Sequence, residues 1–191
     1  AMYTAIAYYT QNTTNDGRPY RINADDFTPS DALNPIKSTC QKNYNLLITD
    51  GMSTTDQNTR VMSFVSTYND GDGNTTTAAA AASGSTAPKY FGSKNVDDVA
   101  WYAYNKNIFD PTTSPTKPKH KITTYVVYSG EECTSKDGNG NCTGGSAVET
   151  EPEYLMQQTA TNGGGSYYLA KDQTAFRTAL QTIFENIAGQ A

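Results

Sequence analysis

The stretch Tyr44-Asn45-Leu46-Leu47-Ile48-Thr49-Asp50-Gly51 decides the fold class. Its apolar residues are consecutive rather than alternating, and the run ends in Asp-Gly, a common turn pair. A short unbroken run of this kind is typical of a strand in a parallel sheet that is covered on both faces. We therefore predict a buried parallel strand over 44–49, with Asp50 at its carboxyl end.

Helical and strand patterns alternate on both sides of this run. The predicted helices cover 2–11, 61–68, 95–104, 152–161 and 172–187, and two further strands cover 121–129 and 166–170. We expect Asn95 and Asp172 to cap the helices that follow them, and Asp97 and Asp98 to lie in a first helical turn. Such alternation predicts an α/β fold, doubly wound around a mainly parallel sheet, with helices on both faces.

Composition argues for an exported protein and against a nucleic-acid partner. The chain has 191 residues, which fits one domain, and 14 Lys and Arg against 19 Asp and Glu give a net charge of −5. A broad basic field for nucleic acid or an anionic membrane is missing. Charged residues are only 17% of the chain and there are 14 Tyr. This neutral-polar composition is typical of secreted and cell-surface proteins, and no apolar stretch is long enough to predict a membrane span.

Three cysteines leave one without an internal partner. Cys133 and Cys142 are nine positions apart in a polar loop, and Cys40 stands alone before the strand at 44–49. The spacing lacks the paired Cys-x-x-Cys of a zinc site, so we predict a Cys133–Cys142 disulfide and an oxidising compartment. Cys40 is then left for a partner outside this chain.

Two loops carry oxygen side chains at alternating positions, as calcium loops do. They are Asp70, Asp72 and Asn74 in the first loop, and Asp137, Asn139 and Asn141 in the second. Neither loop has a Glu at the twelfth position counted from its first ligand, where Ala81 and Val148 stand instead. Turn formation is the favoured interpretation of both, with a calcium site at Asp70, Asp72 and Asn74 as the alternative.

Enzyme motifs are weak in this sequence. His120, the only histidine, has no acidic or Cys neighbour in the sequence, so we expect a solvated side chain rather than a catalytic one. The run Gly163-Gly164-Gly165 lacks the Lys-Ser/Thr of a phosphate loop and is interpreted as a helix end leading into a strand. The sequence therefore predicts a protein that is not an enzyme.

Four motifs together resemble the second half of a von Willebrand factor type A domain, most closely the version in the type IV pilus tip adhesins of the PilY family. They are Leu46-Leu47-Ile48-Thr49-Asp50-Gly51, Val96-Asp97-Asp98-Val99-Ala100-Trp101-Tyr102, Ile122-Thr123-Thr124-Tyr125-Val126-Val127 and Asn162-Gly163-Gly164-Gly165-Ser166-Tyr167-Tyr168. The resemblance implies one partial domain over 1–191, with loop insertions near 12–39, 69–92 and 130–148. It also implies that the strand beside 44–49 comes from an upstream segment or a partner chain.

The resemblance further implies a metal site. Asp50 matches an acidic ligand of the Mg²⁺ or Mn²⁺ site in such domains, whose Asp-x-Ser-x-Ser loop and Thr ligands do not occur at the required place in this chain. The implied protein is an extracellular, metal-dependent adhesion module at a pilus tip or cell surface, binding pilus minor subunits or a surface or host ligand. The alternatives are an α/β enzyme with a metal-assisted Asp50 and a purely structural pilus component.

Overall fold

A computed structural model describes residues 1–30, 34–51, 58–71, 94–109, 120–143 and 151–190 of the chain. The elements are α1 (Met2–Thr10), β1 (Asn43–Thr49), α2 (Thr59–Val65), α3 (Val96–Asn105), β2 (Ile122–Tyr128), α4 (Pro152–Asn162), β3 (Gly164–Leu169) and α5 (Gln173–Ala188). Their order confirms the alternation of helices and strands expected from the sequence.

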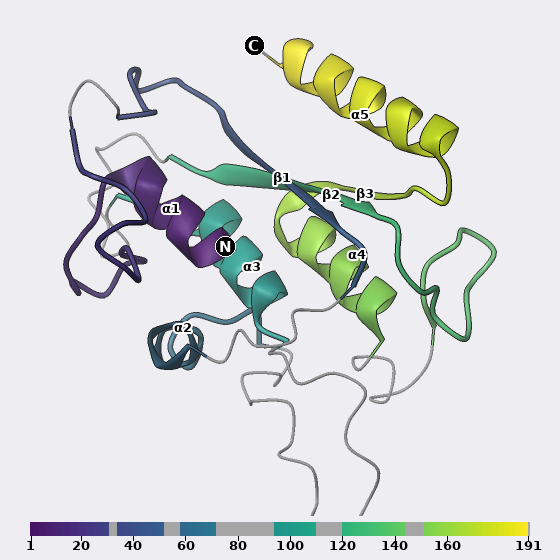
Figure 1. The fold of residues 1–191 in the computed structure, drawn as a ribbon, viewed down its shortest axis with the longest axis horizontal. Coiled ribbons are helices and arrows are strands. Elements are labelled where there is room, and N and C mark those ends of the chain that lie inside the picture. Colours follow the sequence, from purple (N-terminus) through teal and green to yellow (C-terminus); the bar gives the residue numbers. More distant parts are fainter. Residues whose placement is uncertain (31–33, 52–57, 72–93, 110–119, 144–150, 191) are drawn as a thin grey trace, which may run out of the picture.

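The three described strands form a parallel sheet in the order β1-β2-β3. Asn43 pairs with Ile122 and Thr49 with Tyr128, so β1 and β2 run side by side over their whole length. Helices cover both faces, with α5 on one and α1, α3 and α4 on the other (Figure 1). The chain therefore has an α/β fold built on an open, all-parallel sheet.

The hydrophobic core follows these layers. On one face Val126 and Tyr128 pack against Leu155 and Met156 of α4. On the opposite face Tyr125 and Val127 pack beneath Ala179 and Ile183 of α5. A third cluster, rich in aromatic rings, joins the helices α1, α2 and α3 to the start of β2; its buried members are Tyr3, Ile6, Phe64, Val65, Val99, Tyr102, Ala103, Ile108 and Ile122.

The prediction that residues 44–49 are buried on both faces is wrong for one face. Leu47 packs into the core beside α4, but Leu46 is 36% exposed and Ile48 is 50% exposed. These two side chains point toward the face that α5 covers, and α5 does not reach over them. β1 is an edge strand among the described residues, whereas β2 is the buried central strand.

The glycine run after α4 also differs in detail from the sequence prediction. α4 ends at Asn162 and Gly163 caps it, but β3 begins at Gly164, two residues before the predicted start at 166. A Cβ at Gly165 would lie 2.2 Å from the carbonyl oxygen of Thr124. Gly164 has a positive φ of 65°. The strand can start this close to β2 only because these residues lack side chains.

Asn95 and Asp172 both occupy the predicted N-cap positions, but of the two only Asp172 makes a side-chain capping hydrogen bond to the described residues. The Asp172 side chain accepts a hydrogen bond from the backbone N–H of Ala175 at the start of α5. Asn95 makes no capping hydrogen bond; its amide donates instead to Met62 Sδ. Asp97 and Asp98 do lie in the first turn of α3, as expected.

Within the part of the chain that the structure describes, no helix combines the length and apolar character needed to cross a bilayer.

The core tyrosines Tyr102 and Tyr128 give a matched test of this packing. The Tyr102 hydroxyl is buried and finds no hydrogen-bond partner among the described residues, whereas the Tyr128 hydroxyl donates to the carbonyl of Glu131 at 2.8 Å. Tyr102→Phe should raise the free energy of unfolding by about 1 kcal/mol, because it removes an unsatisfied buried polar group. Tyr128→Phe should lower it by about 1 kcal/mol. Urea denaturation measures both, and a loss of stability in Tyr102→Phe would contradict this arrangement of the core.

Candidate functional site

A pocket of about 400 Å³ opens at the carboxyl end of β1. The start of α1, the start of α3, one side of α4 and the residues just after β1 surround it. Its apolar wall consists of Met2, Tyr3, Ile22, Leu47, Val61, Val96, Val99, Leu155 and Met156. Ligands of open α/β sheets bind in such a crevice outside the carboxyl ends of the strands, so this pocket is the candidate functional site.

Asp50 lies exposed at the mouth of this pocket, next to the end of β1. The turn that follows is held by Thr49, whose hydroxyl donates to the carbonyl of Gly51 and accepts from the Gly51 N–H. The carboxylate therefore projects from a short, hydrogen-bonded turn. The structure brings Asp50 together with Ala1 and Met2 at the first turn of α1.

The backbone of Gly130 fixes the Asp50 turn from the other side. A Cβ at Gly130 would lie 1.9 Å from the Asp50 carbonyl oxygen and 2.4 Å from the Tyr128 hydroxyl. The neighbouring Ser129 N–H donates to the Thr49 carbonyl at 3.0 Å. Close backbone contact between the two strand ends thus sets the position from which Asp50 projects.

The pocket also contains a buried amide with an unused acceptor. Asn95 is 1% exposed, and its Oδ1 makes no hydrogen bond among the described residues. Asn58, another lining residue, already accepts from the Arg60 N–H with its side chain. The Asp50 carboxylate and the Asn95 carbonyl are both acceptors, so the pocket suits a cation or a hydrogen-bond donor.

The described residues do not gather a second acidic group around Asp50. Within them, the one group of three Cys, His, Asp or Glu side chains with metal-ligand spacing is Cys133, Cys142 and Glu153, whose ligand atoms lie within 4.8 Å of one another. Those two sulfurs are joined in a disulfide, and only a free thiolate is a good metal ligand. This group is therefore structural.

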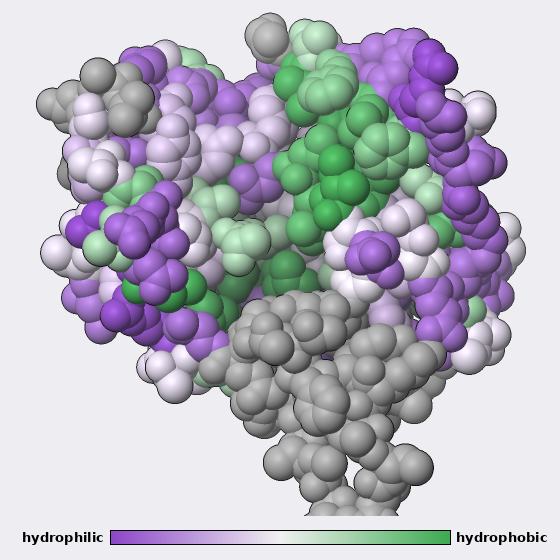
Figure 2. All heavy atoms as spheres, viewed as in Figure 1, coloured by the Kyte–Doolittle hydropathy of each residue, from purple (hydrophilic) through white to green (hydrophobic). Residues whose placement is uncertain are grey.

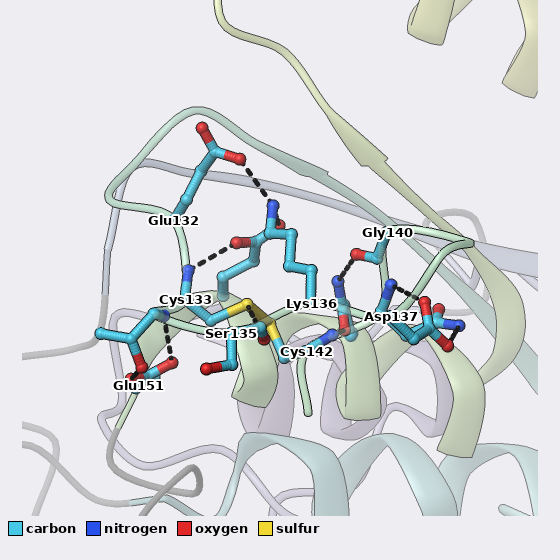
Figure 3. Close-up of a disulfide and its surroundings, with 12 residues drawn as sticks. Glu132, Cys133, Ser135, Lys136, Asp137, Gly140, Cys142 and Glu151 are labelled. Carbon is cyan, nitrogen blue, oxygen red and sulfur yellow. Dashed lines mark hydrogen bonds and ion pairs between the residues drawn. A yellow bond between two sulfur atoms is a disulfide. The ribbon is translucent and has the colours of Figure 1, made fainter. Parts of the chain in front are cut away.

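The expected disulfide between Cys133 and Cys142 is present, with the Cα atoms 5.9 Å apart, and Cys40 is a free, exposed thiol. The cross-linked loop lies against α4 and is tied to it by side chains of that helix (Figure 3). Gln157 accepts from the Cys142 N–H and donates to the Gly140 carbonyl. Figure 3 also shows Asp137 turned back onto its own loop.

Glu153, a fully buried carboxylate on α4, anchors this loop. It accepts from the Cys133 N–H at 2.7 Å, from Lys136 Nζ at 2.7 Å and from the Tyr167 hydroxyl at 2.9 Å. Burial, together with the bond to Glu153, raises the pKa of Tyr167 well above its usual value. Sequence reasoning missed Glu153, since its three partners are 14 to 20 residues away in the chain.

The two loops considered as calcium sites differ in how much of each the structure describes. Asp70 accepts from Asn162 Nδ2 at 2.6 Å and its N–H donates to Asp98, but Asp72 and Asn74 fall outside the described residues. In the second loop, Asp137 accepts from the N–H groups of Asn139 and Asn141. The hydrogen bond from the Asn141 side-chain amide contributes most to lowering the pKa of Asp137, and the bonds from the backbone N–H groups add to it. Asp137 thus forms a turn, as its composition predicted.

The expectation that His120 is solvated is wrong. The side chain is buried, and its ring meets the edge of Phe109 with centroids 5.2 Å apart. Its backbone N–H donates to Asn107 Oδ1 at 3.3 Å. His120 therefore packs just before β2, remote in sequence from every lining residue of the Asp50 pocket, and takes a structural role.

Comparison with known proteins gives no relative: no protein-family model, no curated protein and no solved structure matches this chain.

Gly130 tests the geometry of the Asp50 turn. Gly130→Ala should lower the free energy of unfolding by about 2 kcal/mol, because the new methyl group must displace the Asp50 carbonyl or the Tyr128 ring. Gly138→Ala is the matched control, since a Cβ there meets nothing within 4 Å. Thermal unfolding followed by circular dichroism compares the two. Equal stability of both variants would show that the strand ends are not in close contact.

Proposed function

We propose that this protein is a metal-dependent binding module of an extracellular adhesin at a pilus tip or cell surface. The observation that carries the proposal is the Asp50 carboxylate, exposed at the carboxyl edge of a parallel sheet beside a pocket and the start of α1. A carboxylate in this position is available to a cation without costing the core any packing. The disulfide at Cys133 and Cys142 supports export to an oxidising compartment.

In this proposal Asp50 supplies one oxygen ligand to Mg²⁺ or Mn²⁺, and the remaining ligands come from residues outside those described here. A hard divalent cation keeps open positions for water or an incoming carboxylate, so a ligand carboxylate completes its coordination. Asn95 is the other described acceptor of the pocket. Calcium at Asp70, Asp72 and Asn74 is a separate proposal.

Binding is favoured over catalysis by the lining of the pocket. Its described residues include Asp50 as the only acidic side chain and contain no His, Cys, Lys or Arg. General acid–base or nucleophilic chemistry needs a second titratable group or an activated nucleophile within hydrogen-bond reach. The enzyme alternative therefore draws no support from these residues.

We also propose that a further strand, from an upstream segment or a partner chain, pairs with β1. Support comes from the exposed side chains of Leu46 and Ile48 and from Phe184 of α5, which is 58% exposed. Hydrophobic side chains gather in a band over β1 and the adjacent flank of α5 (Figure 2). An edge strand with apolar side chains is a template for pairing with another chain.

Asp50→Ala tests the metal proposal in the full-length protein. The variant should lose at least about tenfold in affinity for Mn²⁺ and lose metal-dependent adhesion with it, while the fold stays intact. Isothermal titration calorimetry measures the affinity, and circular dichroism controls for folding. Asp25→Ala, which removes an exposed carboxylate from the 12–39 insertion, should leave both properties unchanged. Unchanged Mn²⁺ affinity in folded Asp50→Ala would remove Asp50 from the site.

Ile48→Lys tests whether β1 is an open edge strand. Residues 1–191 alone should self-associate through β1, and a lysine at position 48 should weaken that association at least about tenfold by placing a charge on the exposed strand. Sedimentation velocity over a range of protein concentrations measures the effect. Asn186→Lys, on the exposed side of α5, is the control and should associate like the wild type. A wild-type protein that stays monomeric throughout would contradict an open edge at β1.

A further inference from the structure

A second pocket, of about 440 Å³, lies between α1, α2 and the segment 15–20. Among the described lining residues, it shares only Tyr3 with the Asp50 pocket and contains none of those proposed to hold a metal. Its lining combines aromatic rings with arginines and small polar side chains, unlike the largely aliphatic wall of the Asp50 pocket. The two pockets therefore suit different ligands.

Aromatic rings form the base of this second pocket. Tyr3 and Phe64 meet edge to face with centroids 5.4 Å apart, and Phe64 and Tyr68 lie 5.1 Å apart. Tyr20 closes the ring cluster at 6.3 Å from Tyr3. Burial raises the pKa of Tyr3 to about 12, so its hydroxyl is neutral at ordinary pH. A ring with an apolar face of C–H groups is a ligand that such a base accommodates.

Arg60 supplies a positive charge without a carboxylate partner among the described residues. Its Nη1 donates to the carbonyls of Arg21 at 3.2 Å and Ile22 at 2.6 Å, and its guanidinium lies 5.0 Å from the centroid of the Tyr20 ring. Nε and Nη2 make no hydrogen bond to the described residues. The guanidinium is thus held in place by carbonyls and by Tyr20, with the N–H groups of Nε and Nη2 left for an anion.

Arg18, the other arginine of the pocket, is already neutralised. It forms an ion pair with Asp16 and donates to the Phe109 carbonyl at 2.7 Å. Burial acts to raise the pKa of Asp16, but the hydrogen bonds from Arg18 and Asn12 outweigh it and hold that pKa below its usual value. Within the described lining of this pocket, one uncompensated positive charge therefore remains, at Arg60.

We propose that this pocket binds a sugar that carries a carboxylate, with the acid on Arg60 and the ring against the tyrosines. The rim side chains Asn15, Thr59, Ser63 and Thr67 offer donors and acceptors of the kind that sugar hydroxyls need. A single guanidinium matches the single negative charge of a carboxylate, whereas a phosphate monoester carries up to about two negative charges and a nucleic acid carries a row of them. The site stands independently of Asp50 and of any metal.

The test compares methyl β-D-glucuronide, methyl β-D-glucoside and glucose 6-phosphate by two-dimensional ¹H–¹⁵N NMR titration of the protein. The glucuronide should shift the Arg60 Nε–H resonance and the amides of α2, and should bind at least about tenfold more tightly than the other two sugars. Arg60→Gln should reduce glucuronide affinity by about tenfold or more. Arg177→Gln, which removes an exposed guanidinium from α5, should change nothing.

A second variant keeps the test decisive, because Arg60 also holds two backbone carbonyls. Ser63→Trp keeps Arg60 and fills the pocket from the exposed side of α2, so it should abolish binding with an unchanged circular dichroism spectrum. Equal affinity for glucuronide and glucoside, tighter binding of glucose 6-phosphate, or glucuronide binding that survives both Arg60→Gln and Ser63→Trp would each overturn the proposal.

Discussion

The pairing of β2 on both of its edges is the constraint on which the rest of the structure depends. Strand β2 is buried on both faces, so its backbone groups must find partners within the protein. β1 and β3 supply those partners in parallel register, and each parallel connection requires a crossover long enough to carry a helix. Those crossovers place α3 and α4 against one face, and α5 then covers the other.

Apolar spacing was sufficient to predict the elements and their order. The runs at 44–49 and 121–129, and the helical faces of Val96 and Phe176, are local signals that need no tertiary information. Exposure of Leu46 and Ile48 was not predictable, because an apolar run looks the same whether one face or both are covered. The early start of β3 at Gly164 depends on the closeness of the Thr124 backbone, which no local pattern encodes.

Some features of the candidate sites could likewise be predicted from the sequence, and others could not. Asp50 could be singled out because its place after an apolar run puts it at the end of a strand, and the Cys133–Cys142 pairing followed from loop length and composition. The partners of Glu153 and Arg60 are backbone and side-chain groups brought together only by folding. Likewise His120 was misjudged, because its packing partner Phe109 stands 11 residues earlier in the sequence rather than at helical or strand spacing.

The unequal exposure of the three thiol positions has a consequence for oxidative folding. The three cysteines, one exposed and two buried, allow three pairings with a single disulfide. Only the Cys133–Cys142 pairing agrees with the folded structure. Once Cys133 and Cys142 are joined and packed on α4, attack by another thiolate is sterically blocked, whereas Cys40 remains reactive. Refolding with Cys40 capped therefore removes the two misbridged forms and leaves a single oxidation product.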